Sequence, residues 1–295
     1  MAPMSEKTLA PSVTHRDPKG LKFTSVVEAA YDKAVLSDEE AQRVNDMPGL
    51  ADLIGDFITK NRQPNQFANE EISSTYGYPK GYQVRPIAEQ VARLKELFPE
   101  LNGANLEIAK GELPEGAEDW FAIPRWDKLG KSYAEAFEQR IIPALTAIFP
   151  KFYNYRKGEL SAKYLRQHQR TIEMYERLAA EQEGYDILIV PAQFGMRHRG
   201  RSVRRVREMF IANEFGLGVF AIGCMLLIHP ERLVCWEQLH IDCGGDEYDW
   251  VAGGDWTLCP CFRFFDAQVK FNASGVYNAN RRFGSVSGFL GSVAT

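Results

Sequence analysis

The residues in this sequence most able to do chemistry are six arginines that lie between positions 197 and 207. They follow the continuous apolar run 187–190, which predicts a strand buried on both faces, and a loop that contains two glycines. Ser202 is a favourable N-cap for a helix that continues to about Ala212. Free amides at a helix N-terminus attract an anion, and guanidinium groups bind phosphate or carboxylate through two parallel hydrogen bonds. We therefore expect an anion at this arginine junction, which comprises Arg197, Arg199, Arg201, Ser202, Arg204, Arg205 and Arg207.

The arginine junction needs a counter-charge. Positive side chains in the first turn of a helix oppose its dipole, so Arg204 and Arg205 do not serve helix stability. The formal net charge of the chain is −4, the junction carries +6 and residues 151–170 carry +5, which leaves −15 for the remainder. The anion is therefore either a ligand or the protein's own carboxylates, because runs of charge often form paired surfaces.

A second basic feature lies upstream of the junction. A helix is predicted from about Leu160 to Gln182, and the spacing of Lys163, Arg166 and Arg170 would place them on one of its faces. Just before it, residues 151–157 interleave aromatic and basic side chains, which suits single-stranded nucleic acid but equally suits rings that fill a core. If both basic features face the same way, they form a surface for nucleic acid or another phosphate-bearing partner.

Three functions agree with these features. The preferred hypothesis is a non-enzymatic accessory protein that binds nucleic acid or another phosphate-bearing partner through the arginine junction, helped by Lys163, Arg166 and Arg170. One alternative is an enzyme that holds a phosphorylated small molecule at the same junction and uses His240 or Asp242, which share one face of a predicted strand, for proton transfer. The other is a protein–protein adaptor whose arginines pair with acidic surface.

The sequence predicts neither a metal nor a cofactor. Cys259 and Cys261, with Cys235, Cys243 and His240, match no common zinc spacing, and small buried side chains are the simpler interpretation. The sequence has no phosphate-binding P-loop and no complete dinucleotide fingerprint. The five cysteines are too few for a disulfide scaffold, which favours reduced thiols and a cytoplasmic protein.

Several stretches resemble a group of uncharacterised bacterial proteins. They are residues 190–205, 213–218, 229–233 and 284–290, so the resemblance covers the C-terminal half to two thirds of the chain. No activity, ligand or fold comes with that group. The resemblance implies only a bacterial-type cytoplasmic protein.

The helices and strands that the sequence predicts around the candidate site residues indicate an α+β fold. Residues 1–20 are expected to form a flexible tail and 21–105 a helical region, with a capping box at Ser37 and Glu40. Residues 106–238 are expected to form a mixed core, with strands at 106–109, 120–123 and 187–190 and a helix at 132–149 that Pro143 kinks. The apolar run 215–228 is shorter than the about 20 residues of a membrane span, so it predicts a buried helix and no membrane partner. Residues 239–295 are expected to form a β-rich subdomain, and the oligomeric state stays open.

Overall fold

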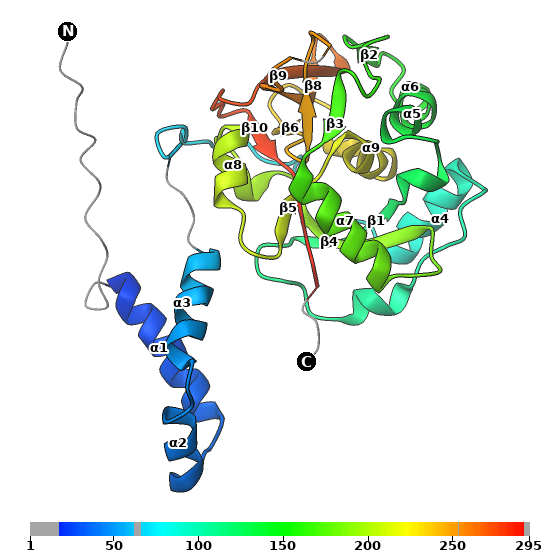
Figure 1. Cartoon of the computed structure of the whole chain (residues 1–295). Helices are drawn as coiled ribbons and strands as arrows, with labels where there is room; N and C mark the ends of the chain where they lie inside the picture. Colours follow the sequence, from blue (N-terminus) through cyan, green and yellow to red (C-terminus); the bar gives the residue numbers. More distant parts are fainter. Residues whose placement is uncertain (1–17, 62–65, 253, 292–295) are drawn as a thin grey trace, which may run out of the picture. The chain divides into compact units, whose positions relative to one another are not determined.

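The computed structural model describes residues 18–61, 66–252 and 254–291. Its contacts divide the chain into two units, one ending at Arg62 and a larger compact one beginning at Gln63 (Figure 1). The fold is α+β, as the sequence predicts, with most strands toward the C-terminus. Among the described residues, no helix is long and apolar enough to cross a bilayer.

The first unit consists of three helices, α1 Pro18–Lys33, α2 Asp38–Asn45 and α3 Leu50–Asn61. The predicted capping box is confirmed, because the Ser37 hydroxyl accepts from the Glu40 amide and the Glu40 carboxylate accepts from the Ser37 amide. None of the side chains described in these helices is buried, and Leu53 is 69% exposed. The predicted tail lies outside the described residues, except for Pro18–Gly20, which begin α1.

The compact unit contains most of the helices. They are α4 Ile87–Leu97, α5 Tyr133–Ala136, α6 Ile142–Ile148, α7 Gln169–Glu181, α8 Val203–Met209 and α9 Val219–Ile228, with a π-helical turn η3 Phe137–Ile141 and 3-10 turns η1 Leu106–Lys110, η2 Trp126–Lys128, η4 Met196–His198 and η5 Pro230–Arg232.

The strands of the compact unit form two sheets. One has the order β1-β4-β11-β5 with antiparallel neighbours, from strands β1 Asp119–Pro124, β4 Ile187–Gln193, β5 Glu214–Gly216 and β11 Ser287–Phe289. The other has the order β10-β6-β8-β7-β3, with β9 paired to β8 and β2; its strands are β2 Tyr153–Asn154, β3 Leu165–Gln167, β6 His240–Asp242, β7 Asp246–Tyr248, β8 Leu258–Phe265, β9 Gln268–Gly275 and β10 Phe283–Ser285.

Helix α9 lies in the core and packs against β1, α4 and α6. All ten of its residues are buried, so it has no polar face. Both ends are capped by ionisable side chains from distant segments. The Val219 amide donates to Asp246 at 2.6 Å, and Arg85 donates to the Ile228 carbonyl at 2.6 Å. A carboxylate at the N-terminus and a guanidinium at the C-terminus are the charges that the helix dipole favours.

The predicted strand at 187–190 is confirmed and extends to Gln193, with every residue buried. The predicted strand at 120–123 is β1. The apolar run 215–228 is not one helix, because residues 214–216 pair with β11 as β5 and the helix begins only at Val219. Hydrophobicity alone cannot separate a buried strand from a buried helix.

Two further local predictions need correction, and the third concerns Pro143. The predicted strand at 106–109 is the 3-10 turn η1, which the Asn105 side chain caps. The helix expected from Leu160 begins only at Gln169, because Leu165–Gln167 pair as β3 with β7. Pro143, expected to kink a helix, follows the wide turn η3, in which the Ile142 amide reaches the Phe137 carbonyl. Tertiary pairing overrides local helical preference in the second case.

Candidate functional site

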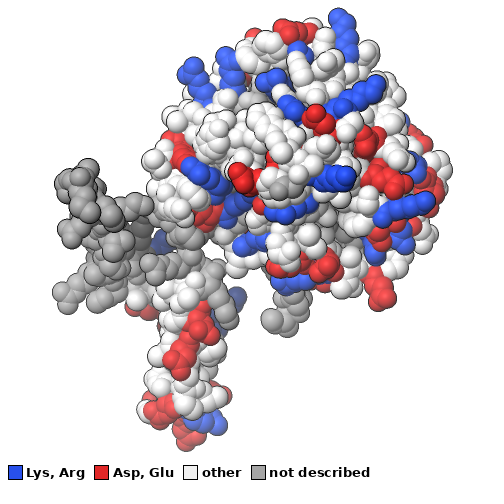
Figure 2. Space-filling view, turned by 45° about the horizontal axis from the view of Figure 1, so that its top comes forward, with Lys and Arg blue, Asp and Glu red and all other residues white. Residues whose placement is uncertain are grey.

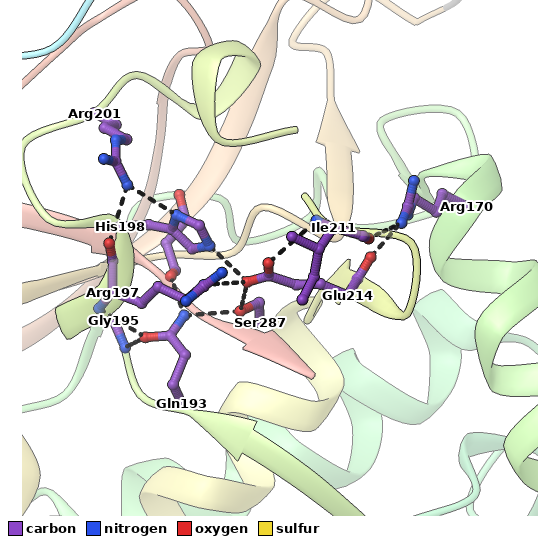
Figure 3. A network of polar contacts seen from close by, with 10 residues as sticks. Arg170, Gln193, Gly195, Arg197, His198, Arg201, Ile211, Glu214 and Ser287 are labelled. Carbon is purple, nitrogen blue, oxygen red and sulfur yellow. Dashed lines mark hydrogen bonds and ion pairs between the residues drawn. The ribbon is translucent and has the colours of Figure 1, made fainter. Parts of the chain in front are cut away.

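The arginine junction is built around Glu214 of β5, a fully buried carboxylate (Figure 3). Its Oε1 accepts hydrogen bonds from Ser287 Oγ and His198 Nε2, both at 2.7 Å, and from Arg197 Nε at 3.2 Å. Burial alone would raise the pKa of Glu214, but the hydrogen bonds from His198 and Ser287 and the charge of Arg197 outweigh it and lower that pKa. Glu214 is therefore an ionised internal counter-charge.

His198 is neutral at this site. Burial, more than the nearby arginines, lowers its pKa against the raising effect of Glu214, to which its Nε2 donates. Arg201 approaches the other ring nitrogen at 3.4 Å, and Gly195 supplies the left-handed backbone (φ 116°) that turns the chain from β4 toward His198. The imidazole therefore holds the junction together rather than offering a proton at neutral pH.

The other arginines of the junction also face carboxylates. Arg204 binds Glu70 through two Nε contacts of 2.8 and 2.9 Å, and the Ser202 hydroxyl donates to the same carboxylate at 2.6 Å. Arg205 lies 2.5 Å from Glu71. Arg205 also pairs with Glu208, Arg201 with Glu71 and Arg207 with Glu247. Five of the six arginines thus have an internal counter-charge.

Arg199 is the exception. Its side chain is exposed and donates to the Tyr76 carbonyl at 3.2 Å, and no carboxylate of the described residues pairs with it.

Most counter-charges of the junction come from segments that are distant in the sequence. Glu70 and Glu71 lie about 130 residues before their arginines, and no local pattern links them.

The upstream basic residues do not share a helix face. Arg166 lies on β3, paired with Glu247 at 2.7 Å and stacked 4.0 Å from the ring of Trp256. Arg170, in α7, donates to the carbonyls of Glu214 and Ala212 at 2.8 and 3.1 Å, while Lys163 is exposed in the segment before β3. Figure 2 shows acidic and basic side chains interspersed on the face of the compact unit that it presents. The single basic helix face that the spacing predicted does not form.

The residues of the enzyme hypothesis lie on β6 and are buried. Burial lowers the pKa of His240 to about 4, with the charges of Arg282 and Arg263 acting in the same direction, so its ring is neutral at pH 7. The ring packs between Trp236 and Phe283, at centroid distances of 5.1 Å. The three thiols nearby, Cys243, Cys259 and Cys261, are buried and reduced.

A feature that sequence reasoning missed is an apolar cavity of about 350 Å³. It is bounded by the end of β1, by the turn η2, by helix α7 and by the N-terminus of α9. Its aromatic walls are formed by Trp126, Tyr133, Tyr175 and Phe220. The ring centroids of Trp126 and Tyr133 are 6.3 Å apart, as are those of Tyr133 and Phe220. Pockets of this size and lining are typical of small-molecule sites.

A buried polar pair supports one wall of this aromatic cavity. The Tyr133 hydroxyl donates to Asp246 at 2.8 Å and accepts from the Phe220 amide at 3.3 Å. Burial raises the pKa of Asp246 to about 7, against the lowering effect of the Val219 amide and of Tyr133. A Cβ at Gly218 would lie 2.3 Å from Asp246 Oδ1, so only glycine permits this packing.

A second cavity of about 460 Å³ adjoins the aromatic one. The two share Tyr133, Gln167 and Ile172 in their walls, and the second adds Arg166 and Glu247. Burial lowers the pKa of the neighbouring His168, and the charges of Arg207, Arg170 and Arg166 lower it further, while Glu247 opposes them. The charged residues that line the second cavity are Arg166 and Glu247, which pair with each other at 2.7 Å.

No known protein family, curated protein or solved structure matches this chain. The functional argument therefore depends on the cavities and the charges themselves.

Proposed function

We propose that the compact unit binds a small amphipathic molecule across the two adjoining cavities. Its apolar, ring-bearing part would occupy the aromatic cavity, and an anionic group would lie beside Arg166. The observation that carries the proposal is the shared wall of Tyr133, Gln167 and Ile172, which joins an apolar cavity to one that is lined by the half-exposed Arg166 and its partner Glu247. Aromatic walls with a few polar groups at one end are typical of sites that orient a small ligand.

The proposed anion preference follows from the residues of the second cavity. Arg166 pairs with Glu247, but its side chain is still 49% exposed, and Arg207 and Arg170 add positive charge nearby. An arginine that stacks on Trp256 is held in place for a carboxylate or phosphate. The sequence predicts Arg166 on a basic helix face, whereas the structure places it on β3.

This proposal is tested with a matched pair of probes, 4-ethylbenzoate and 4-ethylbenzyl alcohol, by calorimetric titration of the full chain. We expect the charged probe to bind more tightly. Ala179→Phe, which fills the aromatic cavity from α7, should weaken both probes at least tenfold, whereas Ala180→Phe, on the exposed side of the same helix, should not. Arg166→Ala should weaken only the charged probe. Equal binding to all variants, or no binding, contradicts the proposal.

Binding of nucleic acid or another phosphate-bearing partner through the arginine junction is a second proposal. Arg199 favours it, because its charge is exposed and unmatched by any described carboxylate. Fluorescent oligonucleotides titrated at several salt concentrations provide the test. If Arg199 contacts a phosphate, Arg199→Ala reduces the salt slope by about one, whereas Arg93→Ala on α4 leaves it unchanged. A salt slope near zero in the unmodified protein rejects this proposal.

A further inference from the structure

A third cavity, of about 220 Å³, lies on the polar face of the second sheet. Asp242, Cys259 and Ser274 contribute to it from β6, β8 and β9, and Asn278 and Asn280 from the turn after β9. Both asparagines are exposed, which places the mouth of the cavity at the surface. Its volume corresponds to about seven water molecules at roughly 30 Å³ each.

No described residue is a partner of the Asp242 carboxyl group. The side chain is 6% exposed, and it forms no hydrogen bond or ion pair with any described residue. Other buried carboxylates of this protein differ, since Glu214 accepts several hydrogen bonds and Asp246 accepts from a helix amide and a tyrosine. A carboxylate with so little exposure and no partner is costly, so a proton, cavity water or a cation must compensate it.

The sheet explains why this carboxyl faces the cavity. In β6, Ile241 lies opposite the buried Phe262 of β8, whereas Asp242 lies opposite Cys261 on the other face. Alternation along the strand therefore separates the apolar core from a buried polar face. The thiols of Cys243, Cys259 and Cys261 interact with Asp242, and burial raises their pKa values, so none of them supplies a positive charge. Arg207 acts on Cys259, and Arg263 and Arg156 act on Cys261, whereas the raised pKa of Asp242 itself is caused by burial.

We propose that this cavity binds a small molecule bearing a protonated amine, with Asp242 as the counter-ion. An ammonium group donates three hydrogen bonds, and the Asp242 carboxylate, the Ser274 hydroxyl and the Asn278 side-chain oxygen are acceptors of suitable type around the cavity. The Asn280 oxygen already accepts from the Arg282 amide at 3.0 Å, and the Ser274 hydroxyl accepts one bond from the side-chain amide of Asn278 at 3.4 Å. A metal ion is the less suitable occupant. Among the described residues, no group of three or more His, Cys, Asp or Glu side chains is arranged to hold one.

Protonation gives the site an expected pH dependence. Burial raises the pKa of Asp242 to about 7, so near pH 6 the group is mostly protonated and must release its proton when an ammonium ion binds. Affinity for an amine should therefore increase between pH 5 and pH 8, and binding at pH 6 should release a proton to the buffer.

The test uses ethanolamine and its uncharged isostere ethylene glycol, titrated calorimetrically into the full chain at pH 6 and pH 8. We expect saturable binding of ethanolamine that is at least tenfold tighter than that of ethylene glycol. Asp242→Asn should abolish this preference, while Asp255→Asn, at an exposed position, should preserve it. Titration at pH 6 in two buffers of different ionisation enthalpy measures the released proton.

Three outcomes overturn the proposal. They are absence of saturable ethanolamine binding, equal affinity for the two probes, and undiminished binding in Asp242→Asn. Thermal stabilisation by Ca²⁺ that Asp242→Asn removes, without an effect of ethanolamine, would identify a metal site instead. The aromatic cavity shares no wall residue with this one, so the result is independent of the function proposed above.

Discussion

The arginine junction and the Asp242 cavity represent opposite ways of burying charge. At the junction, many charges are crowded together, and five of six arginines meet a carboxylate of the same chain. At the cavity, a single carboxylate is buried with no partner among the described residues. The six arginines of the junction stand close together in the sequence, whereas no sequence pattern indicates the cavity around Asp242.

This difference shows that charge density is a poor guide to a binding site. Paired charges already have their counter-ions, so a ligand must compete with an internal carboxylate at the junction. An unpaired buried charge has no such competitor and gains most from a ligand of opposite sign. The following predictions, in order of decreasing expected effect, test whether the junction is structural and Asp242 is the unsatisfied group.

The largest effect is expected from Glu214→Ala. The change leaves Arg197 without its carboxylate and removes the acceptor of His198 and Ser287. The free energy of unfolding should fall by about 3–5 kcal/mol, as for other broken buried ion pairs. Denaturant titration measures this loss, with the exposed Glu237→Gln as the control. A loss no larger than that of the control would mean that Glu214 is not the centre of the junction.

The double variant Arg204→Ala/Arg205→Ala should be the next most destabilising. It leaves Glu70 and Glu71 without their closest guanidinium groups, although Arg201 still pairs with Glu71. We expect the free energy of unfolding to decrease by about 2–4 kcal/mol. Thermal unfolding monitored by circular dichroism provides the measurement, and Arg281→Ala, at an exposed position, is the control. Unchanged stability would show that these arginines are available for a ligand.

Asp242→Asn should stabilise the protein, in contrast to the first two changes. The pKa of Asp242 rises from 3.8 to about 7 on folding, so the folded state holds its proton more tightly. Stability is therefore lost as the pH rises from about 4 to about 7, and the uncharged amide of the Asp242→Asn variant would avoid that loss. The shift sets an upper bound of about 4 kcal/mol, and because the group faces a cavity that water can enter, we expect about 2 kcal/mol.

Melting temperatures at pH 5 and pH 8 test this prediction. The gain from Asp242→Asn should be a few degrees at pH 8 and much smaller at pH 5. The same gain at both pH values would show that Asp242 does not titrate in this range.

The smallest effect on stability is expected from Arg199→Ala. Its side chain is exposed and makes one hydrogen bond to a backbone carbonyl, so the free energy of unfolding should change by less than about 0.5 kcal/mol. The same denaturant titration measures it. A loss comparable to that of the Arg204→Ala/Arg205→Ala variant would assign Arg199 a structural role as well.

Local patterns predicted much of the secondary structure near the site. The buried strand β4, the Ser202 cap of α8 and the short strands after residue 239 follow from apolar runs and from turn residues. The predictions failed where a segment pairs with a strand that is distant in the sequence. Leu165–Gln167 pair with β7 instead of joining α7, and residues 214–216 pair with β11 instead of joining α9.

The sequence by itself determined that the fold mixes helices and strands, and it determined the high density of positive charge after β4. Both properties depend on neighbouring residues. Only the tertiary structure decided which charges are neutralised. Glu70, Glu71 and Glu214 reach the arginines through contacts between segments, and the alternation of β6 turns Asp242 toward a cavity that lacks a counter-ion among the described residues. Electrostatic interactions in a protein depend on distance and burial, and neither can be read from the local order of residues along the chain.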